Sequence, residues 1–106
     1  MREVVITGLG PVTPNGIGKN EFWGNIANGR SFFDTIPWAE KRGYGPIKQN
    51  EIKNFNFEDY FLDDIKKGKY HPKTVRQIVN DDRVIQFGVL ATKLALEDSG
   101  LEYSRE

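Results

Sequence analysis

The sequence predicts an α/β fold with one core strand, an irregular cap region and one long buried helix. Three observations support this prediction. Residues Val4–Thr7 form an unbroken apolar and β-branched run, which is typical of a strand covered on both faces. Residues Asn80–Ser99 carry apolar side chains at helical spacing. Between them, prolines and glycines divide residues 30–79 into short pieces.

The stretch after the expected strand is rich in glycine and raises the question of nucleotide binding. A dinucleotide loop needs G-x-G-x-x-G directly at the start of a helix, where free N–H groups bind the phosphates. Gly8 and Gly10 have the first spacing, but Thr13 stands at the third position and Pro14 follows. The Gly-Lys-Ser/Thr of a P-loop is also missing. We therefore interpret residues 8–18 as a turn in which glycines let the chain leave the strand sharply and prolines stiffen it.

Helical spacing resumes over Asn20–Asn28, with Asn20 as the expected N-cap and Gly29 as the residue that ends the helix. Five nearby aromatic side chains are expected to pack in the core or cap rather than to line a ligand site. They are Phe22, Trp23, Phe32, Phe33 and Trp38.

The cap region, residues 30–79, carries most of the charge. A strand is expected within residues 46–52. A short helical turn is expected over residues 57–62, with Asn56 as its cap, and an exposed basic loop over residues 66–73.

The helix over Asn80–Ser99 is the clearest element, with Asn80 or Asp81 as its cap and Gly100 at its end. Apolar residues cover most of its circumference, so we expect burial on several sides. One face consists of small residues, which predicts close approach of a sheet or another helix: Gly88, Ala91, Thr92 and Ala95.

A buried strand and a helix that is apolar nearly all round require more partners than these residues supply. We therefore expect an incomplete N-terminal portion of a larger α/β domain. Its segments are residues 1–29 (strand, loop and helix), 30–79 (cap) and 80–101 (buried helix).

Composition excludes several kinds of protein. Fifteen basic residues balance fifteen acidic ones, so no overall field favours nucleic acid or an anionic membrane. The absence of cysteine excludes a disulfide framework, a cysteine-ligated metal and a cysteine nucleophile within these residues. The N-terminal apolar run is too short for a membrane span or signal peptide, so we expect a cytoplasmic protein.

Three stretches carry a family resemblance: "VVITGLGPVTPNGIGKNEFWGNIANGRSFF", "NEIKNFNFEDYF" and "DDRVIQFGVLATKLALEDSGL". Together they resemble the opening of β-ketoacyl-acyl carrier protein synthases of the stand-alone type II kind. This resemblance implies a thiolase-like αβαβα fold and a homodimer, or a heterodimer with a chain-length factor. It also implies decarboxylating Claisen condensation of an acyl thioester with malonyl-carrier protein, in fatty acid or polyketide synthesis, without a cofactor.

The resemblance places the family's catalytic cysteine and two histidines downstream of these residues. We therefore predict no catalytic, cofactor-binding or metal-binding residue here, and we expect the chain alone to be inactive. His71, the single histidine, matches neither family histidine and is expected in a surface loop. The acidic pairs Glu58–Asp59, Asp63–Asp64 and Asp81–Asp82 are expected at helix starts and on solvated faces, because adjacent side chains point apart. Metal binding is the alternative for these pairs.

One basic cluster has a possible binding role: Lys66, Lys67, Lys69, Lys73 and Arg76. Acyl carrier proteins are acidic, and the resemblance implies that they bind a basic patch just before the long helix. Lys73 and Arg76 are the candidate contacts. The match is poor after them, since Ile78, Val79 and Asn80 stand where further basic residues are expected. A solvated basic loop is the alternative.

Two other functions stay open at this point. A non-catalytic, chain-length-factor-like subunit would share this opening, and a small independent binding module would fold alone as a cooperative monomer.

Overall fold

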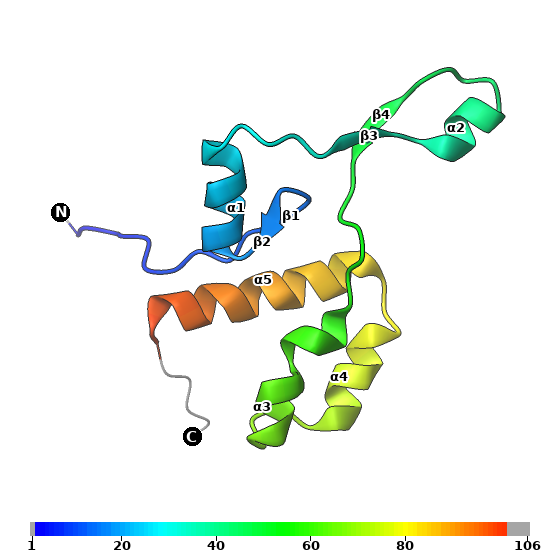
Figure 1. The fold of residues 1–106 in the computed structure, drawn as a ribbon. Coiled ribbons are helices and arrows are strands. Elements are labelled where there is room, and N and C mark those ends of the chain that lie inside the picture. Colours follow the sequence, from blue (N-terminus) through cyan, green and yellow to red (C-terminus); the bar gives the residue numbers. More distant parts are fainter. Residues whose placement is uncertain (1, 102–106) are drawn as a thin grey trace.

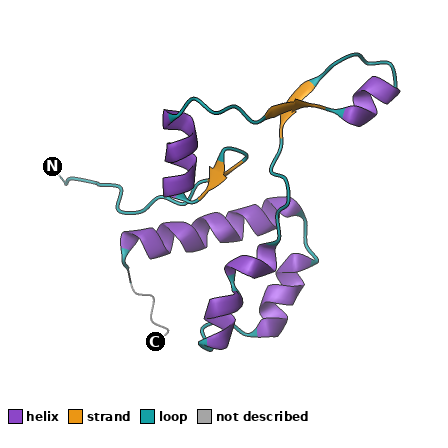
Figure 2. Cartoon of the chain, in the orientation of Figure 1, coloured by secondary structure: helices purple, strands orange, loops and turns teal. Residues whose placement is uncertain are grey.

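The computed structural model describes residues 2–101, and it confirms a mixed α/β chain (Figures 1 and 2). Two antiparallel pairs of short strands are interspersed with helices along the described part. The elements are β1 (Val12–Thr13), β2 (Gly16–Ile17), α1 (Lys19–Ala27), β3 (Phe33–Thr35), α2 (Pro37–Lys41), β4 (Lys48–Asn50), the 3-10 helix η1 (Phe57–Tyr60), α3 (Leu62–Lys66), α4 (Pro72–Val79) and α5 (Arg83–Ser99).

Helix α5 runs through the middle of the molecule, as Figure 1 shows. The hairpin β1–β2 and helix α1 lie on one side of α5, and η1, α3 and α4 lie on the other. Their shared core consists of Phe57, Phe61, Val75 and Leu90, with Val12 and Ile17 from the first hairpin packed against it. The unit β3–α2–β4 projects away from this core as an arm. No helix within residues 2–101 is long and apolar enough to cross a membrane.

The strand expected at Val4–Thr7 does not form. This segment has no hydrogen-bonded neighbour among residues 2–101, and Val4, Val5 and Ile6 are 94%, 72% and 84% exposed. Figure 1 shows it as a trace leading away from the other elements. A strand needs a partner for its backbone groups, and the two described hairpins pair only within themselves.

Helix α5 confirms the long helix but corrects its start and its burial. It begins at Arg83 after Asp82 as N-cap, not after Asn80 or Asp81, and it ends at Gly100 with φ 71°. Leu90 is its one fully buried residue. Val84 is 80% exposed, and Ile85 and Leu96 are also exposed. The apolar residues of α5 therefore contact neighbouring elements on fewer sides of the helix than the sequence predicts.

The small-residue face of α5 is in close contact, as predicted, but its partner is the glycine loop, residues 8–11, and not a sheet or another helix. A Cβ added at Gly10 would collide with the backbone carbonyl of Ala91, and one at Gly8 with that of Ala95. These two glycines therefore allow the loop to lie directly on the helix backbone. Gly88, on the same helix, has no atom within 4 Å of its added Cβ.

Helix α1 confirms its predicted end and corrects its predicted start. Gly29 has φ 66°, and the N–H groups of Gly29 and Arg30 donate to the carbonyls of Ile26 (3.0 Å) and Asn25 (2.9 Å). This is the Schellman pattern. The helix begins directly after Gly18, so Asn20 lies inside it and is not its N-cap.

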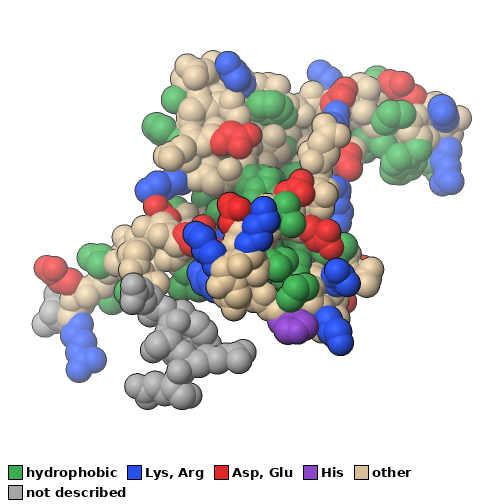
Figure 3. Space-filling view, turned by 60° about the horizontal axis from the view of Figure 1, so that its bottom comes forward, with side chains coloured by type: hydrophobic (Ala, Val, Ile, Leu, Met, Phe, Trp, Pro, Cys, Tyr) green, Lys and Arg blue, Asp and Glu red, His purple; other side chains and the backbone are tan. Residues whose placement is uncertain are grey.

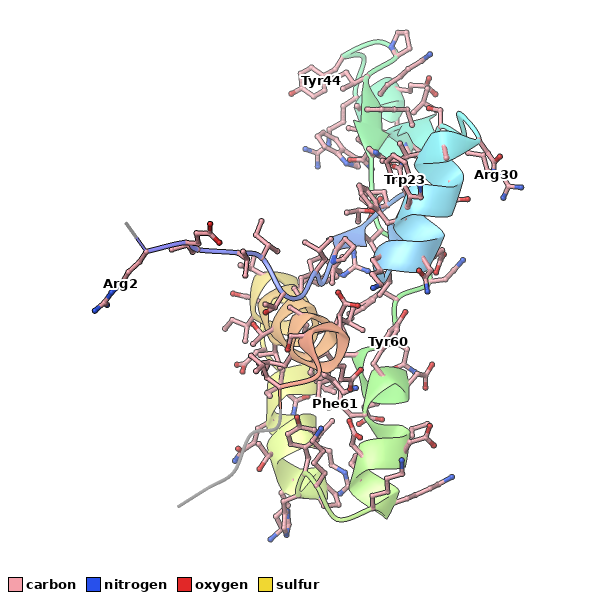
Figure 4. The ribbon with its side chains drawn as sticks, turned by 90° about the vertical axis from the view of Figure 1, so that its left-hand side faces the viewer. Arg2, Trp23, Arg30, Tyr44, Tyr60 and Phe61 are labelled. Atoms are coloured by element: carbon pink, nitrogen blue, oxygen red, sulfur yellow. The ribbon has the colours of Figure 1, made fainter. Side chains whose placement is uncertain are left out.

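The predicted packing of the aromatic side chains is wrong for four of the five. Trp23 is 66% and Trp38 57% exposed, Phe32 and Phe33 are also exposed, and only Phe22 is half-buried. Figure 4 shows Trp23 on α1 and Tyr44 on the arm, far from the core residue Phe61. Among the described residues no element covers the outer sides of α1 and the arm.

The structure of the cap region, residues 30–79, agrees in part with the elements predicted from the sequence. β4 lies within the strand expected over residues 46–52 and pairs with β3, with Phe33 opposite Asn50 and Thr35 opposite Lys48. η1 follows Asn56 as expected, although the Asn56 side chain makes no capping hydrogen bond. The basic segment 66–73 is a loop only over residues 67–71, because α3 ends at Lys66 and α4 begins at Pro72.

Candidate functional site

The hairpin of α3 and α4 carries the predicted basic cluster, and local sequence explains its shape. Gly68, at φ 74°, ends the first helix. Pro72 occupies the first turn of α4, where its fixed φ suits a helix start. The Nδ1 of His71 accepts a hydrogen bond from the Lys73 N–H at 3.1 Å and so caps α4.

All five basic side chains of the cluster are exposed. None forms an ion pair with an acid among residues 2–101. Lys73 and Arg76 lie on α4 at i and i+3, so they share one side of that helix. Figure 3 shows blue side chains near the purple His71 on this end of the molecule. The cluster is therefore free to meet an anionic partner.

Buried contacts hold this hairpin against α5. Val75 of α4 and Phe61 are in the core with Leu90, and Phe61 contacts Tyr70 edge to face with centroids 5.5 Å apart. The Gln86 side-chain amide donates to the carbonyls of Val79 (2.9 Å) and Asp81 (3.0 Å), which fixes the end of α4 to the start of α5. These contacts set the position of Lys73 and Arg76 relative to the long helix.

Lys93 provides an ionic tie between α5 and α3. Its side chain is only 10% exposed, and its Nζ lies 3.1 Å from Asp64 Oδ2, pairs with Glu97 and stands 5.3 Å from the Phe61 ring centroid. Burial acts to lower the pKa of Lys93, but Glu97 and Asp64 together raise it above its ordinary value. Lys93 therefore stays charged.

The acidic pairs do not converge, as predicted, but Asp64 is not on a solvated face. It turns toward Lys93 with a side chain 16% exposed, while Asp63 beside it is exposed. No group of three His, Asp or Glu side chains within residues 2–101 could bind a metal ion.

His71 lies at the surface, as predicted, and its capping role was missed by sequence reasoning. A capping signal was present, because His71 directly precedes Pro72 and the residue before a helix-starting proline is the cap position. Because Nδ1 of His71 accepts a hydrogen bond from a backbone N–H, this atom has a structural role in capping α4.

A small cleft lies between the first hairpin and the chain entering η1. Its volume is about 170 Å³, and its lining includes Thr13, Glu21, Lys53, Phe55 and Tyr60. Burial, and then Glu21 and Asp59, raise the pKa of Tyr60 above its ordinary value. Ligand pockets usually measure about 300–1,000 Å³, so we assign no ligand to this cleft.

Comparisons of the sequence with known proteins place the chain in a family. Residues 1–106 match the family model of the beta-ketoacyl synthase N-terminal domain. The chain therefore belongs to the beta-ketoacyl synthase family, which confirms the resemblance seen in the sequence.

Two relatives show the range of that family. The tetracenomycin polyketide synthase ketoacyl synthase beta subunit of Streptomyces glaucescens is 33% identical over 103 residues, covering 97% of this chain and 22% of the relative. The 3-oxoacyl-[acyl-carrier-protein] synthase 2 of Staphylococcus aureus (strain COL) is 30% identical over 101 residues, covering 95% of this chain and 22% of the relative. The chain thus spans about one fifth of the length of these relatives. No solved structure matches it.

Proposed function

We propose that this chain is the N-terminal part of a 3-oxoacyl-[acyl-carrier-protein] synthase that carries out a decarboxylating Claisen condensation. The family match over residues 1–106 is the observation that carries the proposal. In this reaction a cysteine thiolate takes the acyl group from its carrier protein, whose thiol is released. Malonyl-carrier protein then loses carbon dioxide, and the resulting carbanion attacks the enzyme thioester, which expels the cysteine thiolate and leaves 3-oxoacyl-carrier protein. The chain holds no cysteine, so we assign it a scaffold and no reacting group.

The proposal also covers architecture, assembly and location. Residues 1–29, 30–79 and 80–101 would be the opening strand–helix unit, the cap and the central helix of a thiolase-like αβαβα fold. The exposed apolar side chains of Val4, Val5 and Ile6 support pairing of that segment as a strand in the whole enzyme. The whole enzyme would be a cytoplasmic homodimer, or a heterodimer with a related subunit.

A loading assay tests the activity. The full-length protein, incubated with an acyl thioester of carrier protein, should gain the acyl mass, and it should then form a 3-oxoacyl product when malonyl-carrier protein is added. The 106-residue chain should gain no mass. Acyl loading of the short chain would contradict the proposal.

A second candidate is a non-catalytic subunit of a polyketide synthase. The similarity to the ketoacyl synthase beta subunit of the tetracenomycin synthase favours it. The same loading assay separates the two candidates, because a full-length protein that takes no acyl group but restores product formation by a partner synthase would be the non-catalytic kind.

We further propose that Lys73 and Arg76 bind the acidic carrier protein. Both are exposed on one side of α4, and neither pairs with an acid among residues 2–101. Complementary surface charge mainly steers association. It is therefore expected to affect KM rather than kcat.

Charge reversal in the full-length protein tests this surface. Lys73→Glu with Arg76→Glu should raise KM for carrier-protein substrates about tenfold at low salt, with little change in kcat. Lys73 lies in the first turn of α4, where a glutamate suits the helix dipole. Arg76 lies exposed in the last turn, where a glutamate costs about 0.3–1 kcal/mol, so circular dichroism of the variant should confirm that the fold survives. Lys41→Glu with Arg42→Glu, exposed on the distant arm, is the control. Unchanged KM at low salt would remove this proposal.

A further inference from the structure

Asp98 stands where an acid is unfavourable for its own helix. It lies in the last turn of α5, one residue before Ser99 and next to the negative end of the helix dipole. Aspartate is also among the weaker helix formers. Local helix chemistry therefore gives no reason for an acid here, and the reason must lie in what the carboxylate contacts.

The carboxylate of Asp98 is engaged by two segments from the other end of the sequence. Oδ2 accepts a hydrogen bond from the Leu9 N–H at 2.9 Å, and Oδ1 pairs with the Nζ of Lys19 at the start of α1. The Asp98 side chain is 19% exposed. The hydrogen bond from Lys19, and then that from the Leu9 N–H, lower the pKa of Asp98 below its ordinary value.

The segment held in this way has little else to fix it. Gly8 and Gly10 lie on the backbone of α5 without side chains, and Leu9 is 53% exposed. Further along, Val12 and Ile17 reach the core, and the Gly18 N–H donates to the Pro11 carbonyl at 2.9 Å. Residues 8–11 therefore have apolar anchoring at one end only.

We propose that Asp98 is a latch that holds residues 8–11 and the start of α1 against the C-terminal half of α5. The latch joins three chain segments through one carboxylate, and it fixes where residues 2–7 leave the body of the molecule. When the latch opens, residues 8–11 detach, while the hairpin β1–β2 stays anchored through Val12 and Ile17. Asp98 is thus a positioning residue for the N-terminal segment.

Amide hydrogen exchange in the full 106-residue chain tests the latch. Asp98→Ala should accelerate exchange of the Leu9 amide about tenfold or more, because both of the Asp98 contacts are lost. Lys19→Gln should give a smaller acceleration, since the Leu9 hydrogen bond stays. Exchange of the Arg30 amide, which donates to the Asn25 carbonyl at the far end of α1, should change little in either variant. An unchanged Leu9 amide in Asp98→Ala would overturn the proposal.

Asp98→Asn separates the latch from an effect on α5 alone. Relief of the unfavourable dipole interaction predicts slower exchange in the last turn of α5 and no change at Leu9. The latch predicts faster exchange at Leu9. Asp34→Asn is the matched control, because Asp34 also binds a lysine, Lys53, and a backbone N–H, that of Thr35, but neither contact ties the N-terminal segment to α5. If Asp98→Ala does not fold, Asp98→Asn and Lys19→Gln still decide between the two explanations.

Discussion

Lys93 shows at the residue scale how a charge is accommodated beside the core. Its ammonium group meets two carboxylates, from α3 and from its own helix, and the face of Phe61. The two carboxylates together exceed the effect of desolvation on the pKa of Lys93, so the pKa is raised. The ring face also favours the charged form. Lys93 also joins α5 to α3 through Asp64, 29 positions earlier in the sequence, so its removal affects packing between these helices.

Replacement of Lys93 by methionine should destabilise the chain. The variant keeps an apolar stem of similar size but leaves Asp64 without its cation in a site where it is 16% exposed. We expect a loss of about 2 kcal/mol in the free energy of unfolding, measured by urea denaturation. Lys66→Met, at an exposed position, is the control and should change stability by less than about 0.5 kcal/mol. Equal effects of the two variants would contradict the assigned role of Lys93.

Alkaline pH should weaken the same contact. A raised folded-state pKa means that the ammonium form stabilises the fold at all pH values below the unfolded-state pKa. This contribution is lost as pH rises through the folded-state pKa, which lies above the ordinary 10.5. Urea unfolding from about pH 9 to about pH 12 should therefore show a steeper loss of stability for the wild-type chain than for Lys93→Met. Parallel curves would show that Lys93 titrates alike in both states.

At the scale of elements, α5 is packed tightly at one place and left open at another. The glycine loop touches its backbone at Ala91 and Ala95, whereas Gly88 faces open space. The same substitution at two glycines should therefore have opposite effects. Alanine at Gly10 forces the loop off the helix, while alanine at Gly88 only improves helix propensity.

We expect Gly10→Ala to lower the free energy of unfolding by about 2 kcal/mol or more. Gly88→Ala should raise it by about 0.5–1 kcal/mol. Thermal unfolding of the two variants beside the wild-type chain measures both signs. Gly24→Ala, inside α1 and also without a neighbour within 4 Å, should behave like Gly88→Ala. Stabilisation by alanine at Gly10 would contradict the close contact with α5.

Sequence reasoning predicted the elements whose signals are local. The end of α1 at Gly29 and the long helix through Leu90 depend on residues within one or two turns. The strand at Val4–Thr7 was predicted wrongly because apolar character says nothing about whether a pairing partner is present. The tie from Leu9 to Asp98 spans 89 residues, so spacing alone gives no sign of it. Within the candidate site, the exposed positions of Lys73 and Arg76 were predicted, but the cap by His71 and the Asp64–Lys93 contact were not.

The arm β3–α2–β4 illustrates the limit of burial predictions for aromatic residues. Trp38 and Tyr44 contact each other edge to face with centroids 6.5 Å apart, and the Arg42 guanidinium lies 5.8 Å from the Trp38 ring centroid. These contacts lie within the arm and do not shield the two rings from solvent, so both rings stay exposed. Aromatic content predicts contact, therefore, but not enclosure.

At the scale of the whole molecule, the described chain is open rather than closely packed. Its radius of gyration is 17.4 Å, compared with about 13 Å for a compact domain of this length. Its accessible surface is 8696 Å², compared with about 6,000 Å² for a folded monomer of this mass. Apolar side chains make up part of this excess on the N-terminal segment, α1, the arm and α5.

This exposed apolar surface predicts that the 106-residue chain associates with itself. Large uncovered apolar patches favour contact between molecules, so sedimentation velocity should show species larger than a monomer as concentration rises, and a hydrophobic dye should bind the chain. Phe33→Ser with Trp38→Ser removes two exposed rings of the arm, and it should reduce both association and dye binding with little change in the thermal midpoint, because neither residue is in the core. Val75→Ser, in the core, is the contrasting variant and should lower the midpoint and increase dye binding. A chain that stays monomeric at all concentrations and binds no dye would instead favour an independent binding module.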